Sequence, residues 1–295
     1  MDYYNEIKNT LIDVEVYKKV KDYSKNRYEL EKYYNVGKLL YEAGNAYGED
    51  IIGTFAQKLV NEINKKYNKR YLFDIRKLYL FSKMHPLDAQ LSISHYRILF
   101  PIKDNNAIDY YMRQAIKRNL GKRELTNIIK SKEYERLDDN TKLKLITKEE
   151  ITISDNIKHP IIIKNRFDND DISEKMLKQL ILEDIFNFMK ELGTGFSLID
   201  SEYKIKIGDT SNYIDLLLLN YEFNAFVVVE LKVTKLKKEH VGQIQIYMNY
   251  IDKCVKKAYH EKTIGIIITR HGNDFIMEFC SDPRINNTTY KLIHN

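Results

Sequence analysis

Hydrophobic residues recur every three or four positions through most of the first half of the chain, the spacing of a helix with one buried face. Four segments show it most clearly: 28–41, 51–67, 73–84 and 108–118. Residues 110–129 also divide at Leu120-Gly121 into two short helices. Such a pair is either a DNA-binding helix-turn-helix or, more commonly, an ordinary helical hairpin. We therefore predict an all-α N-terminal domain.

The pattern changes after a run of mixed charges at residues 131–155, and we place the domain boundary there, with domains at 1–145 and 146–295. The spacing of apolar residues over 173–192 predicts one amphipathic helix with Ser173 as its N-cap. Short apolar runs predict strands at 204–207, 213–219, 225–229 and 263–269, with a helix at 237–257 before the last strand. This order indicates an α/β sandwich with a mixed central sheet, so the fold class is α/β overall.

Charge is unevenly distributed along the 295 residues, whose net charge is +6. The first 150 residues carry 29 Lys and Arg against 22 Asp and Glu, whereas residues 151–295 carry 19 against 20. Within 51–132 the basic excess is 17 against 6. A basic block inside a folded domain is typical of proteins that bind a polyanion, and the alternative is a lysine-rich solubilising surface. We predict nucleic acid as the partner.

Three classes of protein are not expected from this sequence. No stretch approaches 18 uninterrupted apolar residues, so no membrane span is expected. The first residues lack the basic and apolar regions of a secretion signal, so we expect a cytoplasmic location. The two cysteines, Cys254 and Cys280, are isolated and suit neither a disulfide framework nor a Cys-rich zinc site.

Charged residues mark the two central predicted strands. Asp215 interrupts the strand at 213–219, and Glu230 and Lys232 follow the wholly apolar run 225–229. Glu230 and Lys232 are two residues apart and so project to one face. Antiparallel pairing of the strands would bring Asp215 beside Glu230. Two carboxylates at the end of a buried strand are costly unless a cation or an ion pair compensates them, and Mg²⁺ or Mn²⁺ prefers such oxygen ligands.

A lysine next to two metal-binding carboxylates has a function in phosphodiester hydrolysis. Lys232 would orient or deprotonate an attacking water, or stabilise charge that develops on a phosphate. The alternative is structural: Glu230 and Lys232 form an edge ion pair, and Asp215 caps a turn.

The arrangement of these residues resembles the PDDEXK nuclease superfamily and, more closely, its YhcG-like family. The resemblance spans nearly the whole chain and includes the N-terminal helices. The stretches that carry it are Gln90-Leu-Ser-Ile-Ser-His-Tyr96, Phe188-Met-Lys-Glu-Leu-Gly193, Tyr213-Ile-Asp-Leu-Leu217, Val227-Val-Val-Glu-Leu-Lys232, Gly242-Gln-Ile-Gln-Ile-Tyr-Met-Asn-Tyr250 and Ile264-Gly-Ile-Ile-Ile268.

The resemblance implies a restriction-endonuclease-like core with Asp215 and Glu230 as metal ligands and Lys232 as the catalytic lysine. Gln243 matches the family's Gly-Gln pair, which implies a contact with water or phosphate, and the alternative is a surface glutamine. The superfamily usually has a glutamate on the first core helix, where this chain has Lys178. The acidic residues on that helix are Glu174, Glu183 and Glu191, and we predict Glu183 as the third metal ligand. If none of the three reaches the metal, its affinity would be weaker or activity would be lost.

The predicted function is that of a metal-dependent DNA endonuclease, which uses Mg²⁺ or Mn²⁺ to hydrolyse phosphodiester bonds of double-stranded DNA. The setting implied by analogy is foreign-DNA defence or DNA repair. Enzymes that cut both strands often act as pairs, so a homodimer is expected. The alternative is a catalytically weak or inactive nuclease-fold protein that acts as a nucleic-acid-binding or interaction module, and the Lys178 departure motivates it. A third reading is a helical scaffold with a C-terminal dimerisation unit.

Overall fold

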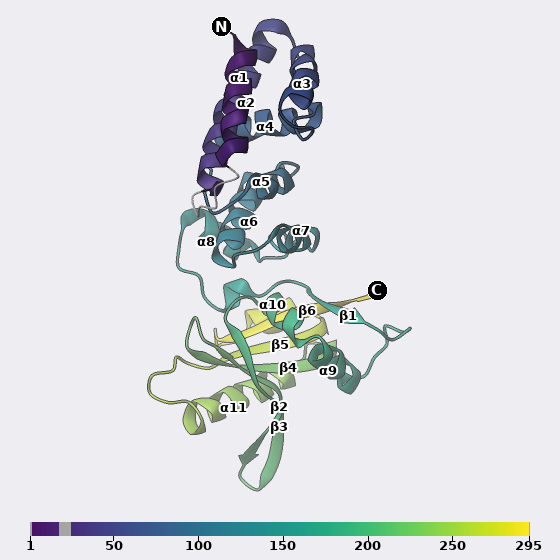
Figure 1. Cartoon of the computed structure of the whole chain (residues 1–295). Coiled ribbons are helices and arrows are strands. Elements are labelled where there is room, and N and C mark those ends of the chain that lie inside the picture. Colours follow the sequence, from purple (N-terminus) through teal and green to yellow (C-terminus); the bar gives the residue numbers. More distant parts are fainter. Residues whose placement is uncertain (1, 18–24, 295) are drawn as a thin grey trace. The chain divides into compact units, whose positions relative to one another are not determined.

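A computed structural model describes residues 2–17 and 25–294 and divides the chain into two compact units, residues 1–134 and 135–295 (Figure 1). This division lies earlier than the predicted boundary at 145/146, because helix α8 (Asp139–Thr147) belongs to the second unit. The helix is held there by Asp155, which accepts hydrogen bonds from Thr141 at 3.2 Å and Lys144 at 2.9 Å.

The described residues of the first unit form seven helices, and the predicted helices are confirmed with shifted ends. Asn68 and Asp104 cap the fourth and sixth helices, since their side chains accept hydrogen bonds from backbone N–H groups of the first turns. Four of the largest side chains in this core are tyrosines, which the structure buries completely (Tyr33, Tyr67, Tyr96 and Tyr111). The helices are α1 Tyr3–Tyr17, α2 Lys25–Tyr47, α3 Asp50–Glu62, α4 Lys69–Ser82, α5 Ile93–Leu99, α6 Asn105–Lys117 and α7 Lys122–Lys130.

A mixed six-stranded sheet forms the centre of the second unit, as predicted (Figure 1). Its order is β1-β6-β5-β4-β3-β2, with parallel pairing from β1 to β4 and antiparallel pairing from β4 to β2. The sequence pattern did not reveal β1 or β6, and β6 consists mostly of polar residues. The strands are β1 Ile161–Asn165, β2 Phe196–Ile207, β3 Thr210–Asn220, β4 Ala225–Lys235, β5 Ile264–His271 and β6 Ile285–His294.

Helices cover both faces of this sheet, which explains why β4 is apolar on both sides. Val227 and Val229 pack in one cluster with α9 (Glu174–Glu183) and α10 (Ile185–Leu192), whereas Phe226 and Val228 pack in another with α11 (Lys238–Cys254). The structure differs from the predicted single helix at 173–192, because the helix is interrupted at Asp184.

Two short helices complete the second unit, a 3-10 turn at Ser154–Asn156 and α12 at Asp274–Glu278. Across the described parts of both units, no helix combines the length and apolarity needed to cross a membrane.

Candidate active site

Antiparallel pairing of β3 with β4 brings Asp215 and Glu230 together. The register runs from Asn220 opposite Ala225 to Leu216 opposite Val229, so Asp215 and Glu230 are the next positions on the two strands. Beyond the paired residues a side chain links the two strands, since Asp215 Oδ2 accepts a hydrogen bond from the backbone N–H of Leu231 at 2.9 Å. This bond orients the Asp215 carboxylate toward the end of β4.

Glu230 is a buried carboxylate with only part of its hydrogen-bonding capacity used. The residue is 2% exposed, and its Oε1 accepts a hydrogen bond from Lys232 Nζ at 2.8 Å. Its other oxygen, Oε2, is buried and has no hydrogen-bond partner among the described residues. Burial, reinforced by the nearby negative charge of Asp215 and opposed by Lys232, raises the pKa of Glu230 to about 7. A buried oxygen of this kind is costly unless a proton or a cation compensates it.

Lys232 lies among three carboxylates. Its ammonium group is bonded to Glu230 and is 3.6 Å from Glu174 Oε2, and Asp215 also contributes to its electrostatic environment. Burial alone would lower the pKa of Lys232, but the hydrogen bond and charge of Glu230, with the charges of Glu174 and Asp215, raise its pKa above the usual value. The lysine is therefore positively charged at neutral pH, before any cation or substrate binds.

A second lysine reaches the site from α9. Lys178 Nζ lies 3.0 Å from Asp215 Oδ1 and 2.8 Å from Glu202 Oε1. Burial opposes its charge, yet the hydrogen bonds and charges of Glu202 and Asp215 raise the pKa of Lys178. Glu202 lies in β2 with φ of 57°, a backbone conformation that non-glycine residues seldom adopt. Lys178 therefore supplies a fixed positive charge at the Asp215 carboxylate.

The donor atoms at this site fit a hard divalent cation held by two carboxylates. Within residues 2–17 and 25–294, no three Asp, Glu, His or Cys side chains converge as a metal site. Mg²⁺, however, is commonly bound through one or two carboxylates, with water and substrate phosphate as its other ligands. Asp215 together with the unpaired Oε2 of Glu230 supplies that minimum set, and Lys178 competes with a cation for Asp215.

Comparisons with known proteins identify the family of this chain. Residues 154–292 match the family model of the YhcG PDDEXK nuclease domain, and residues 13–136 match that of the DUF1016 N-terminal domain. The predicted YhcG-like family is confirmed. A relative in Escherichia coli (strain K12), named "Putative nuclease YhcG", is 25% identical over 195 residues, which cover 64% of this chain and 51% of that protein. The chain thus spans about half the length of this curated relative.

Two solved structures show a more distant likeness to this YhcG-like chain. One is a repair endonuclease from Pyrococcus abyssi, with 20% identity and a TM-score of 0.30, over 42% of this chain and 49% of that chain. The other is a complex of EndoMS with double-stranded DNA, with 18% identity and a TM-score of 0.31, over 42% of this chain and 48% of that chain.

The geometry does not support Glu183 as a metal ligand of this YhcG-like nuclease domain. Its Oε1 pairs with Arg166 at 2.7 Å and accepts a hydrogen bond from Gln179. Helical periodicity explains the difference, because at about 100° per residue Glu183 lies roughly half a turn around α9 from Glu174. Lys178, one turn after Glu174, shares its face and reaches the site.

Glu191, one of the acids available on the predicted helix, and the predicted Gln243 have partners of their own. Glu191 pairs with Arg136 and accepts a hydrogen bond from the backbone N–H of Ile162 at 2.9 Å, so it has a structural function. Gln243 lies on α11 and donates a hydrogen bond to Tyr247 at 3.0 Å. Its predicted contact with water or phosphate stays a prediction.

Two residues near the site were not predicted from the sequence. Glu174 was considered and not chosen, although its position one turn before Lys178 was the available signal. Glu202 was missed entirely, because nothing in the β2 sequence distinguishes it from a surface residue. Asp215, Glu230 and Lys232 are brought together as the spacing predicted.

Proposed function

We propose that this chain is a metal-dependent nuclease that hydrolyses phosphodiester bonds in DNA. The observation that carries the proposal is the buried Glu230, whose Oε2 has no partner among the described residues, next to Asp215 and Lys232. In a purely structural ion pair, both oxygens of a buried carboxylate normally have hydrogen-bond partners. A divalent cation that binds both carboxylates would remove this cost.

Asp215 and Glu230 would hold the cation, either Mg²⁺ or Mn²⁺. When bound, such a cation lowers the pKa of a ligating water and neutralises charge on a phosphate. The hydrogen bond from Leu231 N–H to Asp215 fixes the orientation of that carboxylate, which limits how the cation and the phosphate are placed.

Lys232 acts in this proposal as a charged hydrogen-bond donor. Its raised pKa keeps the ammonium protonated at neutral pH, so it does not serve as a general base in the form described. Its hydrogen bond to Glu230 holds it at the end of β4, where it would bind a phosphate oxygen and stabilise the charge that develops during attack. Gln243 is a further candidate for a contact with water or phosphate.

DNA is the proposed substrate because the basic excess is concentrated in the N-terminal half. The near-neutral charge of residues 151–295 suits the acidic site, whereas the excess of 17 basic over 6 acidic residues at 51–132 suits contacts with a phosphate backbone. Roles in foreign-DNA defence or repair, and action as a homodimer, belong to the same proposal.

One observation favours a second candidate, a nucleic-acid-binding module without turnover. The Lys178–Asp215 ion pair occupies part of the space that a cation needs, with both side chains less than one-fifth exposed. If this pair persists in the presence of Mg²⁺ or Mn²⁺, the nuclease fold would bind nucleic acid without cutting it.

Cleavage of supercoiled plasmid DNA tests the first proposal and separates it from the second. The full chain is incubated with plasmid and Mg²⁺, Mn²⁺ or EDTA, alongside Asp215→Asn and Lys232→Met. The matched control is Asp209→Asn, an exposed aspartate in the turn before β3. Nicking or linearisation with a divalent cation, lost in both site variants and kept in the control, is expected. Absence of cleavage under every metal condition would overturn the proposal and favour the binding module, as would equal activity of the wild type and Asp215→Asn.

A further inference from the structure

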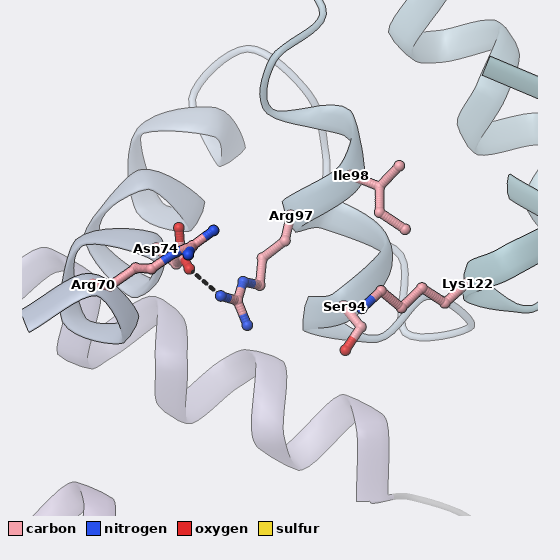
Figure 2. Close-up of a pocket in the computed structure, with 6 residues that line it drawn as sticks. All are labelled: Arg70, Asp74, Ser94, Arg97, Ile98 and Lys122. Carbon is pink, nitrogen blue, oxygen red and sulfur yellow. Dashed lines mark ion pairs between the residues drawn. The ribbon is translucent and has the colours of Figure 1, made fainter. Parts of the chain in front are cut away.

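A small basic pocket lies within the helical unit, apart from the residues of the proposed nuclease site. It has a volume of about 260 Å³ and is formed by α4, α5 and α7 (Figure 2). Its charged residues are three cations and one carboxylate, and a serine hydroxyl and an isoleucine complete the lining. The six residues are Arg70, Asp74, Ser94, Arg97, Ile98 and Lys122.

One cation of this pocket is held in place by other groups. Arg97 pairs with Asp74 at 2.6 Å, the ion pair drawn in Figure 2, and its guanidinium lies 5.5 Å from the centre of the Tyr71 ring. Asp74 neutralises one of the three positive charges, so a net excess of two remains. An arginine whose conformation is already fixed loses little entropy when it binds an anion.

The other two cations are available to a ligand. Arg70 and Lys122 are exposed, and neither has an ion-pair partner among residues 2–17 and 25–294. Both line the same pocket, Arg70 from α4 and Lys122 from α7, so the fold brings together positive charges that are far apart in sequence (Figure 2). Uncompensated cations at a concave site raise the local concentration of anions.

His95 ties the walls of the pocket together. Its Nδ1 accepts a hydrogen bond from Ser92 N–H at 3.1 Å at the start of α5, and its Nε2 donates to the carbonyl oxygen of Leu120 at 3.1 Å, just before α7. This bridge sets the position of Ser94 relative to Lys122. The two helices that carry Ser94 and Lys122 are therefore tied to each other beside the pocket.

Size and charge together indicate the ligand. A volume of about 260 Å³ is below the range of roughly 300–1,000 Å³ that is typical of small-molecule sites. The pocket thus suits a single phosphate group with part of its sugar better than a whole nucleotide. Two net positive charges, an arginine fork and a hydroxyl are the groups that recognise phosphate oxygens.

We propose that this pocket binds a backbone phosphate of nucleic acid and so anchors the substrate through the helical unit. The proposal rests on the proposed function only in its choice of nucleic acid as the partner. The contact would be independent of base sequence, since phosphate contacts position a duplex without reading it.

Salt-dependent binding of labelled double-stranded DNA tests the pocket. The full chain is titrated in EDTA, where a metal-dependent nuclease does not cut, and anisotropy gives the affinity at several salt concentrations. The pocket variant is Arg70→Gln with Lys122→Gln, both exposed and so tolerant of substitution. The control is Lys103→Gln with Arg113→Gln, two exposed cations of the same unit outside the pocket, with the same change in charge. A second variant, Ser94→Asp, places a carboxylate in the pocket, and circular dichroism checks its fold.

The pocket variant is expected to bind DNA roughly tenfold more weakly at low salt, with a salt slope smaller by about one to two. The control pair is expected to lose much less, and Ser94→Asp is expected to weaken binding as well. Equal losses in the pocket and control variants would overturn the proposal, because they indicate diffuse surface charge. So would unchanged binding by the pocket variant, or failure of the wild type to bind DNA.

Two additional arms identify the source of the phosphate and keep the two proposals separate. One contrary outcome is that inorganic phosphate raises the melting temperature of the wild type while the pocket variant binds DNA as tightly as the wild type does. In that case the site takes a free anion and the proposal is wrong. Cleavage with Mn²⁺ is measured on the same proteins. DNA binding that depends on the pocket, without cleavage by any form, upholds the pocket and refutes the nuclease proposal. Cleavage by the wild type, together with DNA binding that the pocket substitutions do not weaken, supports the nuclease proposal and refutes the pocket proposal.

Discussion

Replacing Glu230 with glutamine is expected to stabilise the metal-free protein at about pH 8 and to have little effect at about pH 4. Glutamine keeps the size of the side chain and offers Lys232 an oxygen acceptor, but it carries no charge. The substitution therefore removes the cost of a buried carboxylate with an unpaired oxygen while leaving the packing of β4 in place. Glu230→Gln is therefore more stable than the wild type only at pH values where the wild-type carboxyl is ionised.

The size and sign of the effect follow from the pKa of Glu230, which burial and Asp215 raise from 4.5 to about 7 in the folded protein. Between these values the folded state holds a proton that the unfolded state has released, so the free energy of unfolding falls as pH rises through that window. Each pKa unit corresponds to about 1.4 kcal/mol. The contribution of Glu230 to the free energy of unfolding thus falls by roughly 3 kcal/mol between pH 4.5 and 7, a large part of the ~5–15 kcal/mol that is typical of folded proteins.

Urea unfolding in EDTA, followed by circular dichroism across this pH range, measures the difference between the wild type and Glu230→Gln. The gap is expected to open above about pH 4.5 and to level off above about pH 7. Glu278→Gln, at an exposed position of α12, is the matched control and should show no such trend. A gap that does not change with pH would refute the assignment of Glu230 as a buried carboxylate with a raised pKa. Saturating Mn²⁺ should stabilise the wild type at about pH 8 and the glutamine variant much less.

Three other substitutions test separate parts of the structure. Lys178→Ala frees Asp215 from a partly buried ion pair, so Mn²⁺ affinity measured by calorimetry should rise roughly tenfold, and unchanged affinity would show that the lysine does not compete with the cation. Gly265→Ala would place a Cβ 2.5 Å from the sulfur of Met248, and a loss of about 1–3 kcal/mol in the free energy of unfolding is expected; wild-type stability would contradict this packing. Glu191→Ala removes the carboxylate that pairs with the partly buried Arg136 and accepts a hydrogen bond from Ile162 N–H, so a loss of about 1–3 kcal/mol is expected, and a loss below about 0.5 kcal/mol would contradict the pairing.

The central part of the fold was predictable because its signals are local. The unbroken apolar run at the start of β4 indicates a strand covered on both faces, and the two helical layers confirm it. The short connection to β3 predicts antiparallel pairing, which places Asp215 beside Glu230. The edge strand β1 and its neighbour β6 were not predictable in this way. β6 is mostly polar, and β1 is a short segment of five residues that pairs only with β6, far along the chain.

The residues around the edge of the site could not be predicted, because their positions depend on how helices pack in three dimensions. Choosing among the carboxylates of α9 required the rotation of that helix about its axis, and the predicted Glu183 lies on the wrong face. The ion pair from Lys178 to Asp215 required the position of α9 over the sheet. The basic pocket could not be predicted for a related reason, because Arg70 and Lys122 lie on separate helices and line one pocket only through the packing of those helices.

The central claim is that Asp215 and Glu230 together hold the cation on which DNA cleavage depends. A crystal structure of the chain with Mn²⁺ and a short DNA duplex, with anomalous scattering used to locate the metal, tests it most directly. The account predicts an anomalous peak within about 2–2.5 Å of an Asp215 oxygen and of Glu230 Oε2, with Lys178 moved away from Asp215. No peak at saturating Mn²⁺, with the Lys178–Asp215 ion pair intact, would contradict it.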